Sequence, residues 1–147
     1  MEELRFPMFV SLNGKRAVVV GGGAVGLRRA GVLRDFGASV TVIAPEILKP
    51  LPGITHLARC YRPGDLAGAF LAVAATNDRE TNHAVGAEAK ALGIPINTAD
   101  CQEECDFFFP AVCVTDGLVA GVTGDGGDHR RTAEAARRIR AVLEEMK

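Results

Sequence analysis

The sequence has no long apolar run, almost no net charge, and no repeat or Ser/Gly/Pro-rich linker. A membrane-spanning helix needs about 20 consecutive apolar residues, so the sequence predicts none. The opening residues, MEELRFPMF, also lack the basic and apolar regions of a signal peptide. A formal net charge of -1 gives no overall attraction to nucleic acid. We therefore expect a cytoplasmic protein with neither nucleic acid nor a membrane as a partner.

The cysteines are few, and their spacing does not suit a metal site. Of the four in the chain, Cys60 and Cys113 lie in apolar contexts, and we expect both to be ordinary buried thiols. Cys101 and Cys105 form a C-x3-C pair, but neither a second pair nor a nearby histidine completes a zinc set. We therefore predict no metal site and no disulfide.

What the chain does contain is a globular composition, with 48% hydrophobic and 24% charged residues. Short apolar runs alternate with helical patterns, which predicts a parallel sheet with helices on both faces. The expected strands are 17–20, 40–43, 56–61, 70–75 and 94–97, and the expected helices are 25–36 and 79–92. The predicted fold class is α/β, with a Rossmann-like, doubly wound parallel sheet.

The pattern changes after Asp106. Residues 107–115 and 118–123 read as two strands around an Asp-Gly turn, which predicts a β-hairpin. Residues 132–146 form an amphipathic helical pattern. We expect a single domain over residues 1–147, in which 107–147 form a hairpin and a C-terminal helix as a candidate dimerisation region.

A glycine motif follows the first predicted strand. Gly21, Gly23 and Gly26 form G-x-G-x-x-G, and the predicted helix begins at Val25, directly after Ala24. In a dinucleotide site the first glycine allows a tight turn, the second lets the backbone approach the pyrophosphate, and the third lets helix and strand pack. The N–H groups at the helix start then face the phosphates. The motif predicts a single NAD-binding domain; the alternative is a structural turn that binds nothing.

The usual ribose carboxylate is missing from the end of the second predicted strand. That position normally carries an Asp or Glu about 20 residues beyond the glycines, and here it is Ala44, followed by Pro45. Glu46 comes two residues late, and no arginine stands beside Ala44 to favour a 2′-phosphate. We therefore predict NAD rather than NADP, held mainly by backbone groups, with Pro45 and Glu46 beside it.

Three segments carry a family resemblance. They read FPMFVSLNGKRAVVVGGGAVGLRRAGVLRDFGASVTVIAPE, LAVAATNDRETNHAV and IPINTADCQEECDFFFPAV. Together they cover most of residues 6–123, and they resemble the precorrin-2 dehydrogenase family, the NAD-dependent part of sirohaem synthases. The third segment is the most specific, because a generic NAD-binding module has no reason to carry it.

The resemblance implies a doubly wound NAD domain extended by a hairpin and helices that form a homodimer. It also implies oxidation of the tetrapyrrole precorrin-2 to sirohydrochlorin in sirohaem biosynthesis, with NAD as the hydride acceptor. The family's proposed general base matches Asp100. Some members of the family also insert iron into the product.

The residues themselves support a role for Asp100, because it follows a predicted strand at the carboxyl edge of the sheet. A carboxylate there can take the proton while NAD takes the hydride; alternatively, Asp100 only caps a turn. Thr76 and Asn77 follow another strand, where they could contact the cofactor ribose or simply form a turn. Asn97 could line the nicotinamide pocket or satisfy backbone groups.

The segment 123–131 departs from the resemblance. The family has a stretch rich in Ser and Thr that ends in proline, whereas this chain reads TGDGGDHRR. Arginine suits a substrate with many carboxylates, so we predict Thr123, Arg130 and Arg131 as substrate-binding residues. A solvated helix face is the alternative for the two arginines. For the whole chain, the alternatives are a non-enzymatic NAD-binding regulatory module and a shortened, inactive paralogue.

Overall fold

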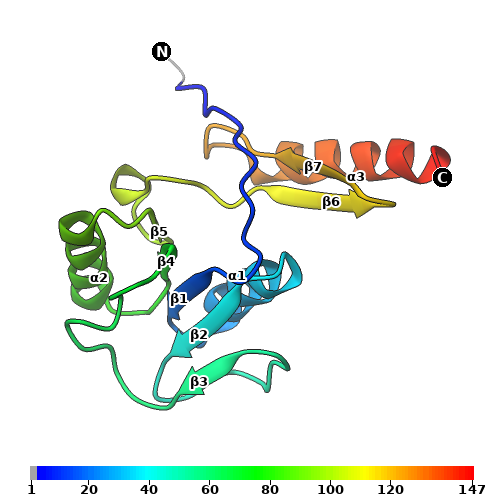
Figure 1. The fold of residues 1–147 in the computed structure, drawn as a ribbon. Helices are drawn as coiled ribbons and strands as arrows, with labels where there is room; N and C mark the ends of the chain where they lie inside the picture. The colour runs from blue at the N-terminus through cyan, green and yellow to red at the C-terminus, as the bar shows by residue number, and fades with distance from the viewer. Residues whose placement is uncertain (1–2) are drawn as a thin grey trace. The chain divides into compact units, whose positions relative to one another are not determined.

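A computed structural model describes residues 3–147, which divide into two compact units. The larger unit comprises Ser11–Phe107. The smaller one combines the N-terminal residues up to Val10 with Phe108–Lys147. The two units are described separately, and Figure 1 shows the elements of each.

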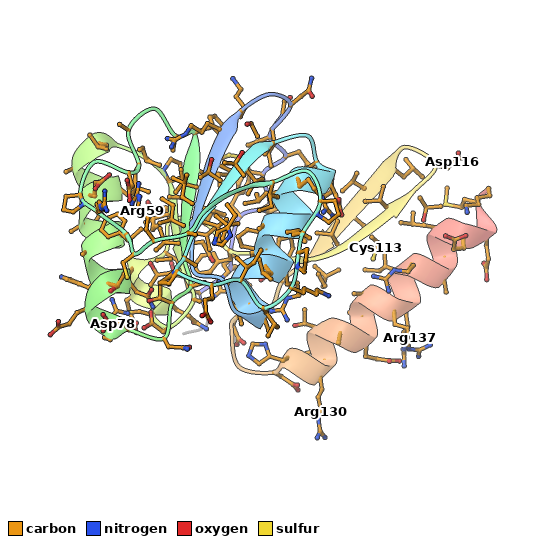
Figure 2. All side chains as sticks on the ribbon, turned by 90° about the horizontal axis from the view of Figure 1, so that it is seen from below. Arg59, Asp78, Cys113, Asp116, Arg130 and Arg137 are labelled. Carbon is orange, nitrogen blue, oxygen red and sulfur yellow. The ribbon has the colours of Figure 1, made fainter. Side chains whose placement is uncertain are left out.

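The larger unit contains a five-stranded parallel sheet in the order β3-β2-β1-β4-β5. Its strands are β1 (Arg16–Val20), β2 (Ser39–Ile43), β3 (Thr55–Leu57), β4 (Leu71–Ala74) and β5 (Ile96–Thr98). The helices α1 (Ala24–Asp35) and α2 (Arg79–Leu92) cover opposite faces of the sheet (Figure 2). A short 3-10 turn, η1, spans Gln102–Glu104. This arrangement confirms the predicted doubly wound α/β class.

The central strands are apolar on both faces because helices cover both sides. Val18, Val19 and Val20 of β1 are at most 1% exposed, as is Val73 of β4. Residues from α2 and from the segment before β4 join one core cluster with these strands, including Val85 and Leu66. The core therefore fixes the carboxyl ends of β1 and β4 side by side.

Local signals explain why α2 has its predicted bounds. Asp78 caps its N-terminus by accepting a hydrogen bond from the Glu80 amide, and Gly93 ends it in the left-handed conformation at φ 69°. The N-cap of α1 is Gly23, which offers no side-chain hydrogen bond. The first amides of α1 thus have no side-chain cap.

The third and fifth strands are shorter in the structure than we predicted from the sequence. The strand predicted at 94–97 begins at Ile96, after Pro95, which has no N–H to donate to the ladder. The third strand ends at Leu57 instead of residue 61. Cys60 therefore lies in a loop and is exposed, so the prediction of a buried thiol was wrong for it.

The smaller unit contains the predicted hairpin and C-terminal helix. Strands β6 (Ala111–Thr115) and β7 (Leu118–Val122) pair antiparallel around Asp116 and Gly117, whose φ values of 54° and 83° suit a tight hairpin turn. Helix α3 (His129–Glu145) begins earlier than predicted because Asp128 caps it, accepting from the Arg131 amide at 3.1 Å. Cys113 is buried, as expected, and its thiol donates to the Ala136 carbonyl oxygen of α3 at 3.3 Å.

Among residues 3–147, no helix combines the length and the apolar character that crossing a membrane would require.

Candidate functional site

A pocket of about 530 Å³ opens at the carboxyl ends of β1, β2 and β4. This edge is where open parallel sheets bind their ligands. Six of the predicted cofactor-binding residues line the pocket: Gly21, Gly23, Pro45, Glu46, Thr76 and Asn77. The predicted residues Ala24, Val25, Gly26 and Asn97 are not among its lining residues.

Two glycines of the motif are required by the protein's own packing. Gly21 has φ +129°, and an added Cβ would lie 2.3 Å from the Ala75 carbonyl oxygen of the segment after β4. A Cβ at Gly26 would lie 2.3 Å from the Gly21 carbonyl oxygen. Both substitutions would push a side chain into backbone, so these glycines let α1 pack close to the sheet.

Gly23 is different, because protein packing does not explain it. An added Cβ there would meet nothing within 4 Å, and its φ of -81° suits any residue. Gly23 borders the pocket and is the N-cap of α1, whose first turn carries no acidic side chain. A helix N-terminus with free amides and no negative charge fits the pyrophosphate of a dinucleotide.

The segment that replaces the ribose carboxylate is held by its backbone. The Leu48 amide donates to the Gly22 carbonyl oxygen at 2.8 Å, and an added Cβ at Gly22 would lie 2.2 Å from the Glu46 carbonyl oxygen. His56 of β3 donates from Nε2 to the Ala44 carbonyl oxygen at 2.8 Å. Residues 44–46 are therefore fixed against the glycine turn, with Pro45 and Glu46 exposed on the pocket.

The Thr76 hydroxyl takes part in the turn before α2. It donates to the Asn82 side-chain oxygen at 2.7 Å and accepts from the Asp78 amide at 3.1 Å. Asn82 is fully buried, and its amide donates back to the Thr76 carbonyl oxygen at 3.1 Å. We predicted no role for Asn82 from the sequence, although it lies in the second family segment. Its hydrogen bonds with Thr76 fix the turn before α2.

Asn97 is buried, and its side chain forms hydrogen bonds within the protein. It accepts from the Arg29 guanidinium at 2.5 Å and donates to the Phe107 carbonyl oxygen at 3.0 Å. Arg29 lies on α1, where burial and the neighbouring charge of Arg28 lower its pKa. The side chain of Asn97 thus links α1 to the segment after η1. Its bond to the Phe107 carbonyl fits the alternative in which Asn97 satisfies a backbone group.

Asp100 follows β5 and forms an ion pair with Arg79, the first residue of α2, at 2.7 Å. The same guanidinium pairs with Glu104 of η1, which also accepts from His83 Nδ1 at 3.0 Å. Hydrogen bonds from Arg79 and then His83 hold the pKa of Glu104 below its ordinary value. Asp100 is partly exposed and is not a lining residue of the pocket.

The pocket lining also includes residues for which we predicted no binding role, Cys60 and Tyr61 among them. Both residues follow β3. Tyr61 is half-buried and donates its hydroxyl to Glu88 of α2 at 2.5 Å. The signal available in the sequence was an aromatic residue just beyond the weakest strand.

The predicted substrate-binding residues belong to the smaller unit. The Thr123 hydroxyl lies 3.4 Å from the Arg5 guanidinium, which also donates to the Gly124 carbonyl oxygen at 3.0 Å. Arg130 and Arg131 occupy the first turn of α3, and both are exposed (Figure 2 labels Arg130).

Comparisons with known proteins agree with the glycine turn and the fold. Residues 8–111 match the family described as "Putative NAD(P)-binding". The "Probable multifunctional siroheme biosynthesis protein HemA" of Ruminiclostridium josui is 42% identical over 94% of this chain and 28% of its own length. The "Siroheme synthase" of Ectopseudomonas mendocina is 42% identical over 94% of this chain and 30% of its own.

A solved structure, "SirC, precorrin-2 dehydrogenase", shares the fold at a TM-score of 0.70 and 24% identity, covering 97% of this chain and 71% of that one. The present chain spans less than a third of the two curated relatives. Its motif, its pocket and these matches agree: the chain belongs to the NAD(P)-binding family that siroheme synthases contain, and the resemblance predicted from the sequence is confirmed.

Proposed function

We propose that this chain is an NAD-dependent dehydrogenase that oxidises precorrin-2 to sirohydrochlorin in sirohaem biosynthesis. The observation that carries the proposal is the pocket around Gly23, found in a chain that aligns over 94% of its length with sirohaem biosynthesis proteins. The solved dehydrogenase with the same fold adds support. When bound, NAD would supply the hydride acceptor.

The glycine turn and the start of α1 would hold the pyrophosphate, through backbone amides and the partial positive charge of the helix end. The end of β2 would face the adenosine ribose. Ala44 offers that ribose no carboxylate, and no arginine stands beside it for a 2′-phosphate. These residues therefore favour NAD over NADP.

Asp100 would accept the proton that leaves the substrate when the hydride is removed. An ion pair fixes the orientation of a carboxylate, and a general base must be positioned on the proton that it takes. Arg79 supplies that ion pair, at 2.7 Å. In this account Asp100 is the catalytic residue, and Arg79 is a positioning residue.

Thr123, Arg130 and Arg131 would bind the substrate, whose carboxylates suit arginine. The protein would act in the cytoplasm as a homodimer. The exposed apolar side chains of the hairpin and α3 support that assembly, since a symmetric interface needs an apolar surface; they include Val114, Leu118, Val119, Val142 and Met146.

The test is to incubate the protein with precorrin-2 and NAD and to follow the absorbance of sirohydrochlorin together with that of NADH. We expect both products from the wild type, and a strongly reduced rate from Asp100→Asn. Asp35→Asn, an exposed aspartate at the end of α1, is the matched control and should keep the wild-type rate. NAD binding without any turnover would instead favour a regulatory module or an inactive paralogue.

A further inference from the structure

Hydrogen bonds to two carboxylates hold the loop that follows β3. Asp65 accepts from both outer nitrogens of the Arg59 guanidinium at 2.9 Å and from the Arg62 amide at 2.7 Å. Glu88 of α2 accepts from the Gly64 amide at 2.7 Å and the Leu66 amide at 2.8 Å. Two carboxylates thus hold the loop from Arg59 to Leu66, one from within the loop and one from α2.

Tyr61 is the aromatic residue in this loop, and both its hydroxyl and its ring make contacts within the protein. Its hydroxyl donates to Glu88 at 2.5 Å, and its ring packs against the core cluster of the larger unit. Burial and the Glu88 hydrogen bond raise the pKa of Tyr61. Burial alone would raise the pKa of Glu88, but hydrogen bonds from Tyr61, Gly64 and Leu66 hold it below its ordinary value. The pair therefore stays a neutral phenol on a carboxylate near neutral pH.

The place of Tyr61 along the sheet edge decides which part of a dinucleotide it would meet. The glycine turn follows β1, the adenosine ribose of such a ligand lies at the end of β2, and β3 is the next strand in the sheet. Tyr61 comes after β3 and lines the same pocket as Ala44 and Glu46. The adenine ring, which extends beyond the ribose, would therefore lie on this side.

We propose that Tyr61 is the surface on which the adenine ring of the cofactor lies, and that Glu88 positions it. This inference rests on the cofactor part of the proposed function. It accounts for how a pocket without a ribose carboxylate holds the adenosine half. An aromatic face contacts adenine through dispersion and needs no charged partner. Tyr61 is also preorganised, because Glu88 and the core fix its ring before the ligand arrives.

The first experiment uses calorimetry to measure the binding of each half of the cofactor, ADP-ribose and nicotinamide mononucleotide, by itself. We expect Tyr61→Ala to weaken binding of NAD and ADP-ribose by roughly 5- to 100-fold, while nicotinamide mononucleotide binds as it does to the wild type. Tyr61→Phe keeps the ring and should bind ADP-ribose within about threefold of the wild type. Thermal unfolding of each variant shows whether it is folded.

The second experiment uses the spectrum of the residue itself. The chain has one tyrosine and no tryptophan, so emission excited at wavelengths that phenylalanine does not absorb comes from Tyr61. We expect ADP-ribose to quench this emission and nicotinamide mononucleotide to leave it unchanged. Glu88→Gln should weaken ADP-ribose binding, because the Glu88 carboxylate also accepts from the Gly64 and Leu66 amides and so holds the loop. It should change the emission, because the Tyr61 hydroxyl loses its carboxylate partner. Lys90→Gln, an exposed change on the same helix, is the control and should do neither.

The outcomes separate this inference from the proposed function. If the wild type binds NAD and oxidises precorrin-2 but Tyr61→Ala binds ADP-ribose as tightly as the wild type, only the inference is overturned. Equal losses for ADP-ribose and nicotinamide mononucleotide in a folded Tyr61→Ala protein would also overturn it. If the wild type binds neither NAD nor ADP-ribose, both the inference and the cofactor assignment fail.

Discussion

The Arg79 guanidinium lies 2.7 Å from the Asp100 carboxylate and joins the first residue of α2 to the segment after β5. Arg79 directly follows Asn77 and Asp78, which line the nucleotide pocket. The candidate base is therefore tied to the helix that borders the pocket. Arg79 forms ion pairs with Asp100 and Glu104, and Glu104 also accepts a hydrogen bond from His83.

Replacing Arg79 should reduce turnover without reducing cofactor affinity. In Arg79→Gln, Asp100 loses its ion pair and its fixed orientation, and we expect kcat to fall about tenfold or more. Arg79→Lys keeps the charge but lacks the planar fork that serves two carboxylates, so it should recover part of that loss. Steady-state kinetics measure kcat, and NAD titration provides the comparison. A drop in NAD affinity as large as the drop in kcat would contradict a positioning role.

Gly23→Ala should fold normally and bind NAD poorly. An added Cβ there meets no protein atom within 4 Å, but it would stand where we place the pyrophosphate. The free energy of unfolding should change by less than about 1 kcal/mol, while NAD affinity falls at least tenfold. Chemical denaturation and calorimetry make the two measurements on the same preparation. Wild-type NAD affinity in this variant would show that the phosphates bind elsewhere.

Gly21→Ala should have the opposite effect and destabilise the fold. The new Cβ would lie 2.3 Å from a backbone oxygen of Ala75, at a φ of +129° that side chains rarely adopt. We expect a loss of about 3 kcal/mol or more in the free energy of unfolding. Urea denaturation measures it. A midpoint equal to that of the wild type would mean that the turn can rearrange at little cost.

The Tyr61–Glu88 pair also predicts a pH dependence. The pKa of Glu88 is lower in the folded state than its ordinary value of 4.5, so the unfolded chain binds protons more readily there. Its contribution to stability is therefore complete above that value and is lost as the pH falls below it. Glu88→Gln should have a smaller drop in urea midpoint over this acidic range than the wild type. Parallel curves for the two proteins would rule the contribution out.

The substrate assignment is testable through KM. Arg130→Gln combined with Arg131→Gln removes two exposed cations from the first turn of α3. We expect KM for precorrin-2 to rise about tenfold through lost charge-assisted contacts, with NAD affinity unchanged. Arg137→Gln, which removes an exposed arginine that pairs with Glu134 further along the same helix, is the control and should leave KM unchanged. An unchanged KM in the double variant would mean that both arginines only belong to a solvated helix face and do not bind the substrate.

Local patterns in the sequence were enough to predict most of the larger unit. The bounds of α2 follow from a capping aspartate and a terminal glycine, both of which act on adjacent backbone. The parallel sheet follows from apolar runs that must be buried on both faces. The glycine motif also placed the pocket, because a strand, a turn and a helix start occur there in immediate succession.

The contacts that sequence reasoning missed join residues far apart in the chain. Tyr61 meets Glu88 across 27 positions, and Arg79 meets Asp100 across 21. No periodicity signals such pairs, since they form only once α2 has packed on the sheet. We expected Cys60 to be a buried thiol because of its apolar context, but the third strand ends at Leu57 and Cys60 is exposed.

The proposal that this chain is an NAD-dependent precorrin-2 dehydrogenase is tested most directly by the stoichiometry of one reaction. Wild-type protein, precorrin-2 and NAD should yield NADH and sirohydrochlorin in equal amounts, and Asp100→Asn should lower the rate about 100-fold or more while binding NAD normally. The claim would be contradicted if the wild type bound NAD and formed neither product, or if Asp100→Asn kept the full rate.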